Sequence, residues 1–444
     1  MSQKKQMIEL LFLKNLMKFI MKYFSGKAQL RAAKRSRRKV ISVILPVGIE
    51  LVTATKAMPV FLLRVGNYSS GTYLRGAQLY KNLFGWNLLH TSINLLRPIL
   101  GNKFFVDIIN QFIANIYGTY ETYTEIAENA GAPLDACFGT RVHLGSTWPH
   151  IKYIHGALGF GTRCNWLAKT FEEVSEKVPL TLLEIPNVNS NITEEVMMES
   201  LNQVISDLEK ITGQTITNEN LRQQIILANQ IRNSYSQILE IWSKDTIPIA
   251  PLTFSYFLAM LHIGFTDFMS EPKFFNRTLQ QIIKDFQKTL KKGGYNATSM
   301  PKFLLVNAIG GYEPKLPEIT DTLGGRIMIA DAEIFNMLEP IETTGDILKN
   351  YARALIRFEL NWMDNTSLVE RYISVAEKYH LQGILFNNMY GCKSITPSLR
   401  LFKERLRDSD LALVDIGFQN IGDNLEQTKT RIGAILEIIR ENAG

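Results

Sequence analysis

Short runs of apolar residues, rich in β-branched side chains and each followed by a glycine, proline or polar residue, recur along this chain. Their near-continuous apolarity is typical of strands that are buried on both faces, as in parallel sheets. Stretches with helical periodicity separate them, for example at 166–177 and 366–380. This alternation predicts α/β units. The predicted strands lie at 39–48, 178–186, 302–311, 325–331, 383–391 and 411–417.

Residues 191–292 follow a different pattern, because their apolar positions recur at helical spacing with no strand-like run between them. Thr193 is a candidate N-cap and Gly213 a candidate C-cap within this stretch. We therefore expect two α/β domains joined by helices. The expected boundaries are 1–39 for a basic N-terminal helical arm, 40–190 for the first α/β domain, 191–296 for the helical connection and 297–444 for the second α/β domain.

The positive charge of the chain is concentrated at its N-terminus. The formal net charge is +7, but residues 1–40 contain twelve Lys or Arg and one acid, Glu9; the remainder therefore carries +7 − 11 = −4. We expect the helical stretch 7–24 to pack on the protein or on a partner subunit, followed by a solvated basic block at 31–39. Contact of this arm with an anionic membrane surface is the weaker alternative, and no nucleic acid partner is expected. No uncharged apolar run reaches 18 residues, so no transmembrane helix is predicted.

Three cysteines in 444 residues are odd in number and sparse. Such usage argues against a disulfide framework and fits a reducing, cytoplasmic environment. Most free cysteines are small buried hydrophobic residues. These three differ because each lies beside glycines and has a basic neighbour, which lowers a thiol pKa and favours the thiolate that binds metal. The cysteines are Cys137, Cys164 and Cys392, and their basic neighbours are Arg141, Arg163 and Lys393.

The residues leave three interpretations of the cysteines open. Three thiolates with a histidine, for which His143 and His155 are candidates, would make a closed zinc site. Three thiolates could instead hold three irons of a [4Fe–4S] cluster and leave the fourth iron open. A single nucleophilic cysteine with a histidine base is the third interpretation. Cys392 and Glu50 each follow a predicted strand, where ligands bind in open α/β sheets.

Four passages carry a resemblance to a known family. They are "VGIELVTATKAMPV" (47–60), "ENAGAPLDACFGTR" with the later "RCNWL", "LEKITGQTITNENLRQQIILANQIRNSY" (208–235) with its Thr-Gly and Asn-x-x-Arg pattern, and the stretch from "GILFNNMYGCKS" through "LVDIGFQNIGDNLEQTKTRIGAILEII" (413–439). In this order they resemble a subunit of the 2-hydroxyacyl-CoA dehydratase/benzoyl-CoA reductase family, and the chain is similar to its 2-hydroxyglutaryl-CoA dehydratase D-components. The resemblance covers roughly 40–440.

The resemblance implies two Rossmann-like, flavodoxin-like domains with a [4Fe–4S] cluster held between them. Carried over residue by residue, Cys137, Cys164 and Cys392 would be the cluster ligands. Glu50 matches the family's motif glutamate and is the candidate acid/base or substrate-contact residue. A first-turn glutamate favoured by the helix dipole is the alternative for Glu50.

The implied function is that of an anaerobic, radical-type lyase or oxidoreductase. A homologous second subunit completes a heterodimer, and an ATP-hydrolysing iron–sulfur activator supplies single electrons. The substrate is an acyl-CoA whose thioester carbonyl takes up an electron. A chain of this kind is either the catalytic subunit or a cluster-holding companion without catalytic function.

Overall fold

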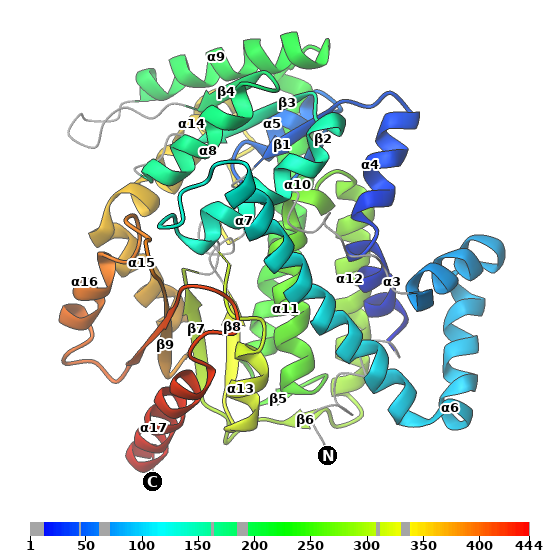
Figure 1. Ribbon diagram of the computed structural model, residues 1–444, viewed down its shortest axis with the longest axis vertical. Coiled ribbons are helices and arrows are strands. Elements are labelled where there is room, and N and C mark those ends of the chain that lie inside the picture. The colour runs from blue at the N-terminus through cyan, green and yellow to red at the C-terminus, as the bar shows by residue number, and fades with distance from the viewer. Residues whose placement is uncertain are drawn as a thin grey trace.

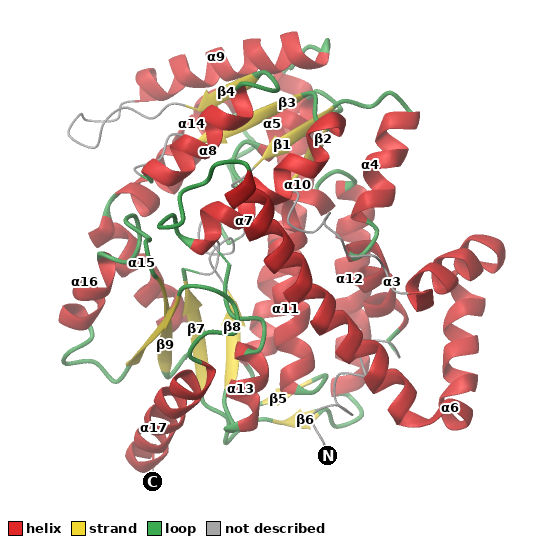
Figure 2. Cartoon of the chain, in the orientation of Figure 1, coloured by secondary structure: helices red, strands yellow, loops and turns green. Residues whose placement is uncertain are grey.

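Two four-stranded parallel sheets organise the protein, and helices cover both (Figures 1 and 2). The α/β class predicted from the apolar runs is therefore confirmed. The structure is a computed structural model. It describes residues 13–43, 46–61, 72–160, 164–183, 194–307, 311–329 and 338–443.

The first sheet has the strand order β2-β1-β3-β4, with every neighbouring pair parallel. The central strands are fully buried, as the apolar run of β1 predicts. Its strands are β1 (Val40–Val43), β2 (Met58–Val60), β3 (Gly156–Phe160) and β4 (Leu180–Leu183). The helices along this half are α5 (Ile49–Ala54), α6 (Thr72–Asn129), α7 (Phe138–Thr147), the 3₁₀ helix η2 (Trp148–Tyr153) and α8 (Asn165–Ser175).

The second sheet has the strand order β10-β9-β7-β8 and is also parallel throughout. Its strands are β7 (Lys302–Val306), β8 (Arg326–Ile329), β9 (Gly383–Met389) and β10 (Ala412–Phe418). The helices along this half are α13 (Leu316–Thr322), α14 (Ile347–Met363), α15 (Asn365–Lys378), α16 (Ser398–Arg405) and α17 (Leu425–Ala443).

Both sheets share one topology. Numbered by chain order within each sheet, the strands run 2-1-3-4 in both halves. This is the doubly wound, flavodoxin-like arrangement, in which the chain changes direction between the first and third strands. The shared order places one crevice between β1 and β3 and an equivalent crevice between β7 and β9.

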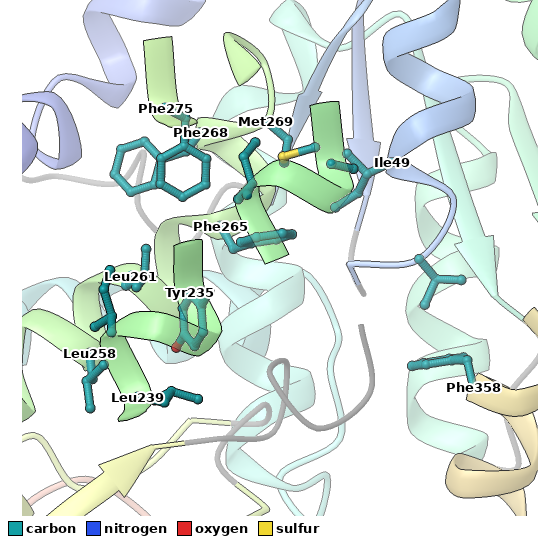
Figure 3. Close-up of a cluster of buried hydrophobic side chains, with 14 of the residues drawn as sticks. Ile49, Tyr235, Leu239, Leu258, Leu261, Phe265, Phe268, Met269, Phe275 and Phe358 are labelled. Atoms are coloured by element: carbon teal, nitrogen blue, oxygen red, sulfur yellow. The ribbon is translucent and has the colours of Figure 1, made fainter. Parts of the chain in front are cut away.

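A layer of helices connects the two halves and carries much of the core. Helix α11 contacts β2 of the first sheet and β8 of the second, so the helical layer packs on both. Figure 3 shows Leu258, Leu261 and Phe265 of this layer among other buried apolar side chains. The predicted boundaries at 190 and 296 stay a prediction. The layer comprises α9 (Glu194–Thr212), α10 (Asn218–Ser243), α11 (Pro251–Phe268) and α12 (Pro272–Leu290), with a small antiparallel ribbon of β5 (Thr246–Ile247) and β6 (Tyr295–Asn296).

Part of the basic N-terminal region packs on this layer. Helix α3 (Lys14–Tyr23) buries Leu16, Phe19 and Ile20 and contacts α11 and α12. Helix α4 (Gly26–Arg35) buries Leu30 and Ala33 and leaves its cations exposed. The predicted start of the helical stretch, residues 7–12, lies outside the described residues. Within the described part of the chain, no helix is both long and apolar enough to cross a membrane.

Candidate functional site

Three of the four candidate residues, Glu50, Cys164 and Cys392, follow the carboxyl ends of strands that flank the two crevices. Glu50 lies in α5, which follows β1, and Cys164 is the N-cap of α8, which follows β3. Cys392 comes three residues after the end of β9. Cys137 is the N-cap of α7, which Figure 1 shows between the two sheets. Ligands of doubly wound sheets bind at these positions, because the helices that follow the two strands diverge there.

The loops of Cys137 and Cys392 pack directly against each other. Gly391 has a φ of +78°. A Cβ atom at Gly391 would lie 2.6 Å from the Asp135 carbonyl oxygen and 3.3 Å from the Cys137 backbone nitrogen. Glycine is required here for both the left-handed backbone and the close approach. The structure thus joins a cysteine loop of the first half to one of the second.

The Cys164 segment reaches the same loops. The Lys393 ammonium lies over the ring of Trp166, 5.5 Å from its centroid. Cys137 and Cys392 both lie near enough to Cys164 to raise the pKa of its thiol by charge repulsion. Three cysteines that are 27 and 228 positions apart in the sequence are therefore brought into one region.

Burial dominates the ionisation of two of these thiols. It raises the pKa of Cys137 and that of Cys164 above the usual thiol range, and neighbouring cysteines add to the rise. Hydrogen bonds to the sulfurs lower these two pKa values. Thr140 and Gly139 at the start of α7 donate to Cys137, and the backbone of Leu167 and Trp166 at the start of α8 donates to Cys164. The start of a helix favours a negative sulfur in this way.

The expectation that a basic neighbour lowers the thiol pKa is wrong for Cys137, and for Cys164 it stays a prediction. The Arg141 guanidinium bonds instead to the Glu128 carboxylate at 2.8 Å and to the Asn420 side chain at 2.9 Å. Arg163 lies outside the described residues. The cations near these cysteines thus hold the loops in place, while the backbone N–H groups face the sulfurs.

The described residues contain no compact set of three His, Cys, Asp or Glu side chains that could hold a single metal ion. A cubane binds each thiolate to a different iron, so its ligands stand farther apart than those of a mononuclear site. His155 does not fit the zinc interpretation, because its Nδ1 accepts a hydrogen bond from the Val40 N–H at the opposite, amino end of β1.

Glu50 lies in a second polar group of its own. Its side chain is buried, and each carboxylate oxygen accepts a hydrogen bond. Arg232 Nη2 of α10 donates to Oε1 at 2.5 Å, and the Tyr351 hydroxyl of α14 donates to Oε2 at 2.9 Å. Burial and the Glu50 charge raise the pKa of Tyr351 well above its ordinary value, so this phenol stays protonated.

Glu50 also lines a small cavity. Its volume is about 20 Å³, which is room for one water molecule. Glu339 and Arg357 form an ion pair at 3.4 Å on its wall, and Arg357 is half exposed. None of the described residues around this cavity is a cysteine. Phe358 of the cavity wall packs edge-on against Phe160 at the end of β3. Phe160 stands four positions before Cys164 in the sequence.

Arg232 and Tyr351 were not predicted as site residues. A signal for Arg232 exists in the Asn-x-x-Arg pattern, because Asn229 Oδ1 accepts a hydrogen bond from Arg232 Nη1 at 3.0 Å. Asn229 also exchanges two hydrogen bonds with the backbone of Ile341, which fixes the arginine relative to the second half. No sequence signal marks Tyr351, which reads as an ordinary apolar position of a helix.

Comparison with known proteins agrees with this geometry. No curated protein matches the chain. A family profile described as "2-hydroxyglutaryl-CoA dehydratase, D-component" matches residues 103–439, which include all three cysteines, Arg232 and Tyr351. The match begins after Glu50 and covers about three quarters of the sequence. The chain therefore belongs to the 2-hydroxyglutaryl-CoA dehydratase D-component family.

Proposed function

We propose that this protein is the iron–sulfur subunit of a radical-type acyl-CoA dehydratase or aryl-CoA reductase. The observation that carries the proposal is the convergence of Cys137, Cys164 and Cys392 from separate loops of a D-component fold. Cys137, Cys164 and Cys392 would hold a [4Fe–4S] cluster. When bound, this cluster supplies single electrons and one iron that can polarise a thioester carbonyl oxygen.

The chain itself provides the surroundings of that reaction. The N–H groups that begin α7 and α8 stabilise the thiolates by hydrogen bonds. The aromatic residues Tyr120, Phe138 and Phe418 form a buried cluster against which Cys392 packs, and they restrict water there. Such shielding strengthens electrostatic interactions with a developing negative charge.

The proposal includes two protein partners. A homologous second subunit completes the heterodimer, and an ATP-dependent iron–sulfur activator delivers the electrons. The family description, which names a component of a dehydratase, supports a multicomponent system.

A second candidate function is that of a non-catalytic companion, which holds a cluster but leaves the chemistry to the other subunit. One observation favours it: both oxygens of Glu50 are already bound by Arg232 and Tyr351. Both oxygens are thus engaged in contacts that hold three helices together. In this function Glu50 is a positioning residue that joins α5, α10 and α14.

Anaerobic purification with the partner subunit tests the first candidate. We expect a brown protein with about four irons per chain, of which Cys137→Ser, Cys164→Ser and Cys392→Ser each remove most. A zinc-containing, colourless protein with unchanged metal content in these variants contradicts the proposal.

Glu50→Gln separates the two candidates, because glutamine keeps the shape and the acceptor oxygen but not the charge. If Glu50 transfers protons, turnover falls by about 100-fold or more while iron content stays the same. If the subunit is a companion, turnover with the assembled complex is retained. Measuring iron in the same preparations excludes loss of the cluster as the cause.

A further inference from the structure

The first part of α6 projects from the body of the protein. Gly85 within α6 has a φ of +81°. Figure 1 shows the first part of α6 turning away from the body before the helix returns toward α7. We call residues 76–99 the outer α6 segment. Only Leu89 of this segment is fully buried among its described side chains.

The outer α6 segment exposes an unusual amount of apolar surface. Of the thirteen large hydrophobic side chains that are exposed on the described part of the chain, seven lie in this segment, with exposed fractions from 42% to 77%. A concentration of exposed apolar side chains on one segment is typical of an interaction surface. The seven are Leu79, Leu83, Phe84, Leu88, Leu95, Leu96 and Ile99.

The charge around this segment has one sign. From Leu51 to Val106 the sequence contains no Asp or Glu, although the chain as a whole contains 42 acidic residues. Helix α4, at the same edge of Figure 1, adds further exposed cations. The cations within 51–106 are Lys56, Arg64, Arg75, Lys81, Arg97 and Lys103.

The exposed apolar side chains and the positive charge together indicate which kind of partner fits the outer α6 segment. The partner must bury leucine and phenylalanine side chains and must also carry negative charge. A second copy of the same segment fails the second condition, because it brings cations against cations. The boundary between headgroups and acyl chains of an anionic lipid bilayer meets both conditions.

We propose that the outer α6 segment docks the protein on anionic membrane surfaces. Leu83, Phe84 and Leu88 lie at the level of the acyl chain boundary, and the Lys81 ammonium faces the lipid phosphates. Trp86, whose ring lies 5.2 Å from the Lys81 ammonium, has the amphipathic character of residues at such interfaces. In this proposal the segment lies on the membrane surface and does not cross the bilayer. This inference is independent of the proposed function.

Vesicle co-sedimentation of the full chain tests the proposal. We expect binding to phosphatidylcholine vesicles that contain about one third phosphatidylserine, and at least about tenfold weaker binding to pure phosphatidylcholine or at high salt. Leu83→Glu/Leu88→Glu should weaken binding by at least about tenfold. The matched control Ile226→Glu/Ile438→Glu changes two exposed apolar residues on other helices and should bind as the unaltered protein does.

Trp86 fluorescence and the oligomeric state provide two further measurements. Quenching of Trp86 fluorescence by brominated lipid, lost in Trp86→Phe, places the segment at the bilayer without relying on the charged variants. Absence of binding by the unaltered protein, or equal loss in the control variant, overturns the proposal. A dimer that Leu83→Glu/Leu88→Glu dissociates, without any binding to vesicles, also overturns it and assigns the segment to contact with a second copy.

Discussion

The Glu50 carboxylate and the Arg232 guanidinium form a buried ion pair, with Oε1 and Nη2 2.5 Å apart. The two side chains are only 6% and 5% exposed. The pair joins the crevice of the first sheet to α10 of the connecting layer. Breaking such a pair by removing one partner leaves a buried charge without its counter-charge.

Arg232→Met is therefore expected to reduce the free energy of unfolding by about 3–5 kcal/mol. Glu50→Gln/Arg232→Met removes both charges, so its loss should be smaller than the sum of the two single variants. Urea unfolding of the three variants measures this coupling. Additive losses would show that the two side chains do not interact.

Gly391→Ala is expected to disturb the junction of the cysteine loops. The added methyl group meets the Asp135 carbonyl oxygen at 2.6 Å, and the backbone has a left-handed φ that costs a non-glycine residue about 1–2 kcal/mol. The loops must separate, and iron content should fall. Gly422→Ala is the matched control, because Gly422 has a φ of +88° but no atom within 4 Å of the added methyl group. Equal iron loss in both variants would assign the effect to backbone strain alone.

Thr140→Val is expected to shift the reduction potential of the proposed cluster without removing the cluster. The Thr140 hydroxyl lies 3.4 Å from Cys137 Sγ. A hydrogen bond to a ligand sulfur favours the reduced, more negative cluster, so its loss should lower the reduction potential by about 20–60 mV, the equivalent of one net hydrogen bond. Redox titration followed by electron paramagnetic resonance measures the shift. Thr147→Val, on the same helix but bonded to the His143 carbonyl, should leave the potential unchanged.

His150 is expected to make stability depend on pH. Burial, with Lys27 and Lys152 nearby, lowers its pKa from 6.5 to about 4. Between these values the unfolded chain binds a proton that the folded chain does not, so stability rises with pH and is lost as the pH falls from 6.5 toward 4. The loss is about 3 kcal/mol at most.

Denaturant unfolding at several pH values tests this assignment. His150→Gln should flatten the profile in that window, because glutamine does not titrate. His380→Asn, at an exposed position where asparagine tolerates the left-handed φ of +51°, should leave the profile as it is. A profile that is unchanged by His150→Gln would show that other groups cause the pH dependence.

Six of the eight strands in the two large sheets could be predicted from apolar runs. The two that were missed, β2 and β3, have physical reasons. β2 has three residues and contains Pro59, and β3 reads Gly-Ala-Leu-Gly-Phe. The β3 glycines are needed for close packing: a Cβ at Gly159 would lie 2.5 Å from Leu182, and one at Gly156 would lie 2.8 Å from Ile211. A requirement set by distant neighbours leaves no periodic pattern in the strand itself.

The candidate site, too, could be predicted only in part from the sequence. The three cysteines could be named because the residue type is rare and the loops match a family pattern. The Arg232 and Tyr351 partners of Glu50 could not be derived, because they lie 182 and 301 positions away. The pKa of Cys137 could not be predicted, because a neighbour in the sequence need not face the thiol in space. Arg141 follows Cys137 closely but turns toward Glu128 and Asn420.

The contact of Gly391 with Cys137 has a consequence for folding, because both halves must be folded before the two cysteine loops can meet. The two positions are 391 − 137 = 254 residues apart, and each lies beside a different sheet. Closing so long a loop is entropically costly until both ends are carried on folded elements. The cysteine region is therefore among the last parts of the protein to form. An inorganic group that needs both loops is therefore inserted after both halves have folded.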